Sequence, residues 1–245
     1  MLKKYDVIFS MGSACLCSQM LRRAGLQFCS YPFDWLAACD FSERIDFLVS
    51  DFNDFFNRED FHFTGRHNAD EHNPCDVYKN NKTGIMFNHD FARGVPFDVS
   101  YPAVKAKYDR RINRLLNDID RHKNILIVFT EVPPPPPPVH TVSDNITENT
   151  NDDVLISGYN KIIRRFPNKN IDLLYIACAP DRSERQIGEH IFKLTFDYKN
   201  SCGIPPHDAR VLRTAVKNYR LKRSLGQRIK NALFRLKKHL KNRRF

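Results

Sequence analysis

The 245-residue chain contains no apolar run that approaches the ~20 residues needed by a bilayer-spanning helix. Its first ten residues hold only about six strand-like positions, too few for the apolar region of a signal peptide, and this predicts a cytoplasmic location. Neither a Walker loop nor a dinucleotide fingerprint occurs, so we expect no bound cofactor.

Disulfide and metal signatures are also missing. Seven cysteines, an odd number without framework spacing, predict free thiols in a reducing compartment. His62, His67, His72 and Cys75 lie close together, but steps of five residues do not bring side chains to one helix face. No Cys-x-x-Cys or His-Glu-x-x-His motif is present, so the sequence predicts no metal site.

Acidic residues are absent after Asp208, and this absence explains the net charge of +11. Residues 217–245 hold twelve Lys or Arg, whereas the rest of the chain is close to neutral. The tail, residues 209–245, therefore carries the basic excess. Its apolar residues recur at helical spacing, at Leu221, Leu225, Ile229, Leu233, Leu236 and Leu240.

This pattern predicts a C-terminal basic amphipathic helix. One apolar side and one cationic side suit the surface of an anionic membrane, so we expect residues 217–245 to hold the protein peripherally on the inner membrane. Nucleic acid would need the charge but not the apolar stripe, and is not the expected partner. The alternative is a helix docked on the body of the protein, with its lysines solvated.

Short apolar runs alternate with helical periodicity in residues 1–208. Strands are predicted at 5–10, 84–87, 125–129 and 171–177, and helices at 15–23, 41–56, 104–121 and 154–166. The alternation predicts a single α/β domain with a mainly parallel sheet flanked by helices. The polar stretch 58–81 is predicted as surface loop or short irregular strands, and 185–196 is ambiguous. The six prolines within 133–153 predict an exposed loop, since proline has no backbone donor.

Cys15 lies where the first strand gives way to the first helix, with Ser13 as the expected N-cap. The first turn of a helix favours the thiolate form of a cysteine, which makes Cys15 a candidate nucleophile. The alternative is that Cys15 and Cys17 are small buried hydrophobic residues.

Two further polar clusters stand among apolar residues. His89, flanked by Asn88 and Asp90, follows a predicted strand, and a neighbouring carboxylate could orient its ring to act as a base. The alternative is a structural histidine in a turn. Asp34 lies beside Trp35, the only tryptophan, and either binds a partner or caps the helix that begins nearby.

The motifs together give a resemblance to a known family. They are Ser10–Cys15, Leu21–Leu26, Pro32–Trp35, Asn88–Phe91 and Lys107–Ile112. In order and spacing this set resembles the DUF1796 family of papain-like cysteine peptidases over roughly residues 5 to 130, although each motif alone is weak.

The resemblance implies an enzyme that uses Cys15 as nucleophile and His89 as base, with Asp34 or Asp90 as orienting group. Such a hydrolase or acyl transferase would act on a peptide, acyl or glycan substrate that the sequence leaves unspecified. Four residues of the motifs are assigned to substrate binding: Gly12, Ser13, Asn88 and Trp35. Arg110, Arg111 and Arg114 either bind an anionic group of the substrate or form a solvated helix face.

Other readings stay open. Papain-like domains place the cysteine helix against a mainly antiparallel sheet, whereas this chain predicts a parallel one. The turn at Ser13 also resembles the nucleophile position of SGNH-type esterases, but their late Asp-x-x-His element is absent. The remaining alternatives are a membrane-associated transferase of cell-surface polysaccharide assembly and a non-catalytic membrane adaptor that docks through the prolines.

Overall fold

A computed structural model describes residues 3–12, 14–67, 74–131, 150–179, 181–196 and 214–222. The helices in these ranges are α1 (Cys15–Arg23), α2 (Phe41–Val49), α3 (Phe97–Arg121) and α4 (Asp152–Arg165), with the 3₁₀ helices η1 (Pro32–Trp35) and η2 (Arg58–Asp60). The strands are β1 (Lys3–Tyr5), β2 (Val7–Ser10), β3 (Leu36–Ala37), β4 (Phe61–His67), β5 (Cys75–Asn80), β6 (Met86–Ala92), β7 (Asn124–Thr130), β8 (Asn170–Cys178), β9 (Ser183–Ile187), β10 (Ile191–Phe196) and β11 (Tyr219–Leu221).

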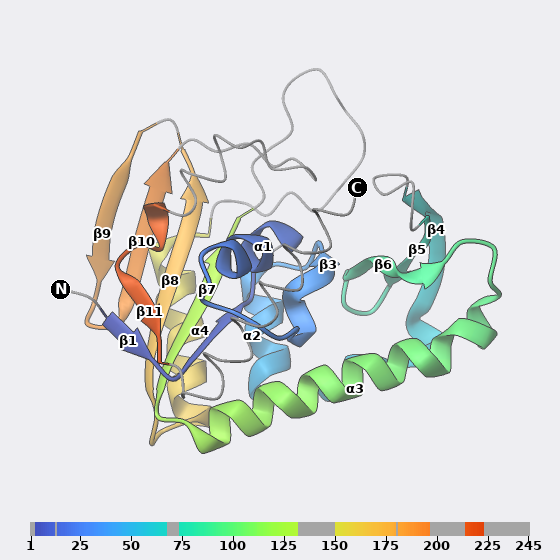
Figure 1. Cartoon of the computed structure of the whole chain (residues 1–245), viewed down its shortest axis with the longest axis horizontal. Coiled ribbons are helices and arrows are strands. Elements are labelled where there is room, and N and C mark those ends of the chain that lie inside the picture. The colour runs from blue at the N-terminus through green and yellow to red at the C-terminus, as the bar shows by residue number, and fades with distance from the viewer. Residues whose placement is uncertain are drawn as a thin grey trace, which may run out of the picture.

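The central sheet has five strands in the order β2-β7-β8-β10-β9. The first four strands are parallel, and β9 is antiparallel to β10. The side chains of successive residues in β7 point to opposite faces of this sheet. Leu126 and Val128 belong to the apolar cluster that includes α1, whereas Phe129 packs edge-to-face on Phe41 of α2. Helices therefore cover both faces (Figure 1).

A second sheet has the order β3-β6-β5-β4 and is antiparallel throughout. The long helix α3 runs from this sheet to the start of β7 (Figure 1). Tyr108 of α3 is fully buried, with its ring 5.4 Å from that of Phe87 in β6 and 5.2 Å from that of Phe56. Because α3 packs on β6 and then leads into β7, it ties the two sheets together.

The prediction of a mainly parallel sheet is corrected by this second sheet: the domain is mixed α/β. The segment predicted as loop or irregular strand forms β4 and β5. Their residues carry no continuous apolar run, because one side of these strands is largely exposed. Most of the exposed residues of β4 are polar, and Phe63, at 55% exposed, is the exception. The ambiguous stretch 185–196 forms most of the hairpin of β9 and β10.

The prediction of a C-terminal amphipathic helix is wrong for its first residues. Tyr219–Leu221 form β11, which pairs in parallel with β1, and Leu221 packs against the α1 cluster instead of starting an apolar helical stripe. The rest of the predicted helix, from residue 223, lies outside the described residues. The same is true of the prolines at 133–138.

Within the ranges that the structure describes, no helix combines the length and the apolar character required to cross a bilayer.

Candidate active site

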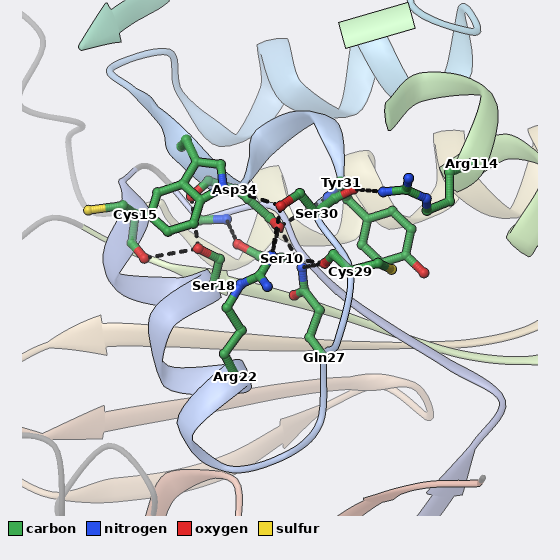
Figure 2. A network of polar contacts seen from close by, with 12 residues as sticks. Ser10, Cys15, Ser18, Arg22, Gln27, Cys29, Ser30, Tyr31, Asp34 and Arg114 are labelled. Atoms are coloured by element: carbon green, nitrogen blue, oxygen red, sulfur yellow. Dashed lines mark hydrogen bonds and ion pairs between the residues drawn. The ribbon is translucent and has the colours of Figure 1, made fainter. Parts of the chain in front are cut away.

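Cys15 is the first residue of α1, as the sequence predicts. The N-cap is Ala14 instead of the expected Ser13, which lies outside the described residues, and no side chain caps the helix. No acidic residue occurs in the first turn. The Gln19 side-chain amide donates to the Cys15 sulfur at 3.5 Å. The sulfur points away from the other polar side chains labelled in Figure 2. The helix start therefore presents a half-buried thiol beside backbone amides that no capping side chain occupies.

Cys17 differs from Cys15 in every respect that bears on reactivity. It is fully buried, its thiol donates to the Val128 carbonyl at 3.3 Å, and burial raises its pKa to about 11. A Cβ at Gly12 would lie 2.4 Å from the Cys17 Cβ and 2.8 Å from Thr130 Oγ1. The turn after β2 thus packs so closely on Cys17 that residue 12 must lack a side chain. The alternative of a small buried hydrophobic residue applies to Cys17.

Asp34 is the centre of a buried polar network made with Ser18, Arg22, Gln27 and Ser30, here called the Asp34 network (Figure 2). Its Oδ2 accepts from Arg22 at 2.9 Å, Gln27 at 2.6 Å and the Tyr31 amide at 3.0 Å.

Burial raises the pKa of Asp34, and the hydrogen bonds from Gln27, Tyr31 and Arg22 oppose that increase. The bond from the Tyr31 amide belongs to a capping box at η1. The Asp34 carboxylate therefore holds η1 and the segment before it against α1, and it both pairs with an arginine and contributes to the start of a helix.

His89 projects from β6 toward η1. It is exposed, so the expectation of costly buried polarity does not apply to it. Its ring lies edge-to-face with Trp35, with centroids 6.3 Å apart. Ser18 Oγ contacts both the Cys15 carbonyl at 3.1 Å and the Asp34 carbonyl at 2.8 Å. One serine therefore links the residue that carries the thiol to the residue next to Trp35, which in turn contacts His89.

Of the two neighbours of His89, Asp90 faces α3. Asp90 has a buried side chain whose Oδ1 pairs with Lys107 at 2.6 Å and whose Oδ2 accepts from Tyr108 at 2.8 Å. These contacts fasten β6 to α3. Asn88 is half-buried, and its Oδ1 is buried without a hydrogen-bond partner among the described residues.

The three candidate arginines extend along α3 from this point. Arg111 lies with its guanidinium carbon 5.1 Å from the Tyr108 ring centroid, and its Nη1 is buried without a partner in the described part of the chain. Arg114 donates to the Ser30 carbonyl at 2.7 Å, and Arg110 is exposed. Within the same ranges none of the three forms an ion pair.

Sequence reasoning assigned no role to Ser18, Arg22 or Gln27, although Arg22 lies in the motif Leu21–Leu26. All three are polar residues that lie 7 to 16 residues from Asp34 along the chain, beyond any helical or strand period. The double arginine at the end of α1 was the nearest signal, but such pairs usually lie at a solvated helix end.

Metal ligands do not gather in the structure. No group of three or more His, Cys, Asp or Glu side chains is placed to hold a metal ion among the residues described. The residues considered as metal ligands lie in different surroundings: His62 is exposed on β4, Cys75 is buried on β5, and His72 lies outside the described ranges.

A family model with the description "Putative papain-like cysteine peptidase (DUF1796)" matches residues 6–155. The chain belongs to the DUF1796 family. The matched range contains α1, η1, β6 and α3, which are the elements that carry Cys15, Trp35, His89 and the arginines.

Relatives of this DUF1796 protein include "Uncharacterized protein R408" of Acanthamoeba polyphaga mimivirus, which is 24% identical over 197 residues, covering 75% of this chain and 82% of the viral protein. No solved structure matches the chain. The cysteine helix α1 packs on β2 and β7 of the central sheet, whose strands there are parallel, and the antiparallel sheet that carries His89 is a separate one.

Proposed function

We propose that this protein is a cysteine-dependent hydrolase or acyl transferase, with Cys15 as the nucleophile and His89 as the general base. The observation that carries the proposal is the contrast between two neighbouring thiols. Cys15 begins an uncapped helix and is half-buried, whereas Cys17 is enclosed. The ring contact between Trp35 and His89 also supports the proposal, because Trp35 belongs to η1, which packs against the cysteine helix α1.

The proposed reaction proceeds in two steps. His89 takes the proton of the Cys15 thiol, and the thiolate attacks the substrate carbonyl carbon. Amides at the start of α1 stabilise the oxyanion of the tetrahedral intermediate. The leaving amine or alcohol takes the proton from the imidazolium, and a thioester remains on Cys15. Water in a hydrolase, or a second nucleophile in a transferase, then releases the acyl group and restores the thiol.

Asp34 and Asp90 serve this arrangement as positioning residues. Asp34 holds η1, and therefore Trp35, against α1 through Arg22. Asp90 holds β6, and therefore His89, against α3 through Lys107 and Tyr108. Neither carboxylate needs to exchange a proton with the substrate in the proposed mechanism.

The substrate is proposed to carry an anionic group. Arg111 lies one helical turn from Tyr108, which binds the residue next to His89, and Arg111 has no carboxylate partner among the described residues. Trp35 and Asn88 are proposed to contact the rest of the substrate, and Gly12 shapes the turn beside the thiol.

The test is activity against a panel of fluorogenic peptide amides, acyl esters and acyl thioesters. Cys15→Ala is expected to fold and to lose all turnover, whereas the matched control Cys178→Ala, which removes another half-buried thiol, keeps it. Retention of turnover in Cys15→Ala together with its loss in Ser13→Ala would instead establish an SGNH-like esterase.

A peripheral location on the inner membrane surface is proposed from the composition of the tail. Twelve basic and no acidic residues in 217–245 favour anionic lipid, at about 1 kcal/mol for each basic residue near the surface. The full chain is expected to sediment with phosphatidylserine-containing vesicles and not with phosphatidylcholine vesicles. Equal recovery with both lipids, or with neither, would contradict this proposal.

A further inference from the structure

A cavity of about 480 Å³ lies along the edge of the central sheet at β2. Its walls come from four places: Val7 and Ile8 of β2, the segment 26–31 that follows α1, Asp118 and His122 at the end of α3, and Leu221 with Lys222 at the end of β11. Cys15 and His89 do not line it. The cavity is therefore separate from the proposed catalytic site.

The edge of β2 beside this cavity is open to pairing. The Asp6 amide donates toward β7, to the Asn124 carbonyl at 2.8 Å, whereas the Tyr5 carbonyl accepts from the Lys222 amide at 2.7 Å on the outer side. Directly after β2 the Met11 amide donates to the Val128 carbonyl of β7 at 2.8 Å. Backbone groups of alternate strand residues point to opposite sides, so Val7 also faces β7 and the backbone of Ile8 faces outward. β11 pairs only with Lys3–Tyr5, and no strand in the described ranges pairs with the outer side of β2.

The polar groups at the α3 side of the cavity are Asp118 and His122. Asp118 is half-buried, accepts from the Tyr31 hydroxyl at 2.7 Å, and forms no ion pair with a basic side chain among the described residues. His122 Nδ1 lies 2.8 Å from the Asp118 carbonyl oxygen, which can only accept, so Nδ1 carries a hydrogen.

The remaining charges on the cavity largely neutralise each other. Lys222 Nζ pairs with Asp6 at 2.9 Å. Among the described lining residues, Asp118 is thus the carboxylate without an opposite charge, and the chemistry that complements it is a cationic hydrogen-bond donor.

We propose that this cavity is a docking groove for an extended peptide segment of a partner protein that carries a Lys or Arg side chain. The peptide backbone adds to the sheet at the outward edge of Ile8, and the basic side chain binds Asp118. Main-chain pairing supplies affinity and the charged contact supplies selectivity, as in other complexes formed by strand addition. The proposal does not depend on the catalytic one.

The test uses the full chain and a positional-scanning library of acetylated pentapeptide amides. The retained peptides are expected to be enriched in Lys or Arg over Glu at one position. Asp118→Asn keeps an acceptor for Tyr31 but is expected to weaken the selected peptide by about tenfold or more. The matched control is Asp120→Asn, which removes the same charge from an exposed position on the same helix and is expected to bind as the wild type does.

Amide hydrogen exchange then locates the peptide. Binding is expected to slow exchange at Ile8, whose backbone faces outward, and to leave Val7, which already bonds to β7, nearly unchanged. A library without basic enrichment, equal affinity for Asp118→Asn and the wild type, or unchanged exchange at Ile8 would each overturn the proposal.

Discussion

Removal of the Asp34 carboxylate tests whether the buried network holds the candidate site together. Asp34→Ala leaves the Tyr31 amide without its acceptor and Arg22 without its counter-charge, although Arg22 keeps the Cys29 carbonyl and Ser30 hydroxyl as partners. Breaking a buried ion pair costs about 3–5 kcal/mol. The Arg22 side chain is 28% exposed, which places the expected loss at the lower end, about 3 kcal/mol.

For a chain of this size, such a loss lowers Tm by about 6–12 °C. The measurement is thermal and urea unfolding at pH 7, followed by circular dichroism and by the emission of Trp35, the only tryptophan. A double-mutant cycle with Arg22→Ala is expected to give a coupling energy of about 1–3 kcal/mol. A change below about 0.5 kcal/mol in Asp34→Ala, or strict additivity with Arg22→Ala, would refute the structural role of the network.

Three further predictions follow from individual contacts. Gly12→Ala places a Cβ 2.4 Å from the Cys17 Cβ, so urea unfolding should show a loss of about 2 kcal/mol or more, and an unchanged midpoint would contradict the packing. Burial alone would raise the pKa of Asp6, but hydrogen bonds from Asn124 and Lys222 lower it to about 2. Because that pKa is depressed, the ionised Asp6 carboxylate adds about 1 kcal/mol, after allowance for screening, to the free energy of unfolding. This stabilisation is present above pH 4 and is lost as the pH falls toward 2. Stability curves of Asp6→Asn and wild type should therefore converge in acid, and a constant gap would exclude this linkage. Arg111→Ala should raise KM about tenfold for an anionic substrate and leave its uncharged amide unaffected, whereas equal effects on both would remove the anion site.

Elements with strong local patterns were predictable from the sequence. α1 begins and ends at the predicted residues, and β7 and β8 follow continuous apolar runs that only a sheet buried on both faces requires. The helix predicted at 104–121 starts after Pro102. The observed α3 begins earlier, at Phe97, and contains Pro102.

Other features were not predictable, because they depend on contacts between distant segments. β4 and β5 pair with each other and with β6, and this pairing fixes them without an apolar pattern of their own. In the candidate site, the place of Cys15 at a helix start follows from local sequence. The bonds of Asp90 to α3 cross 17 or 18 residues, and no local pattern indicates them.

The central claim is that the Cys15 thiol is a nucleophile activated by its helix start and by His89. The most direct measurement is the rate of iodoacetamide alkylation at each of the seven cysteines between pH 5 and 9, resolved by peptide mass spectrometry, in the wild type and in His89→Ala. The account predicts that Cys15 reacts fastest, with an apparent pKa below the ordinary thiol value of about 8.5, and that His89→Ala moves this pKa upward. Slow, uniform labelling of all cysteines, or a Cys15 profile that His89→Ala leaves unchanged, would contradict it.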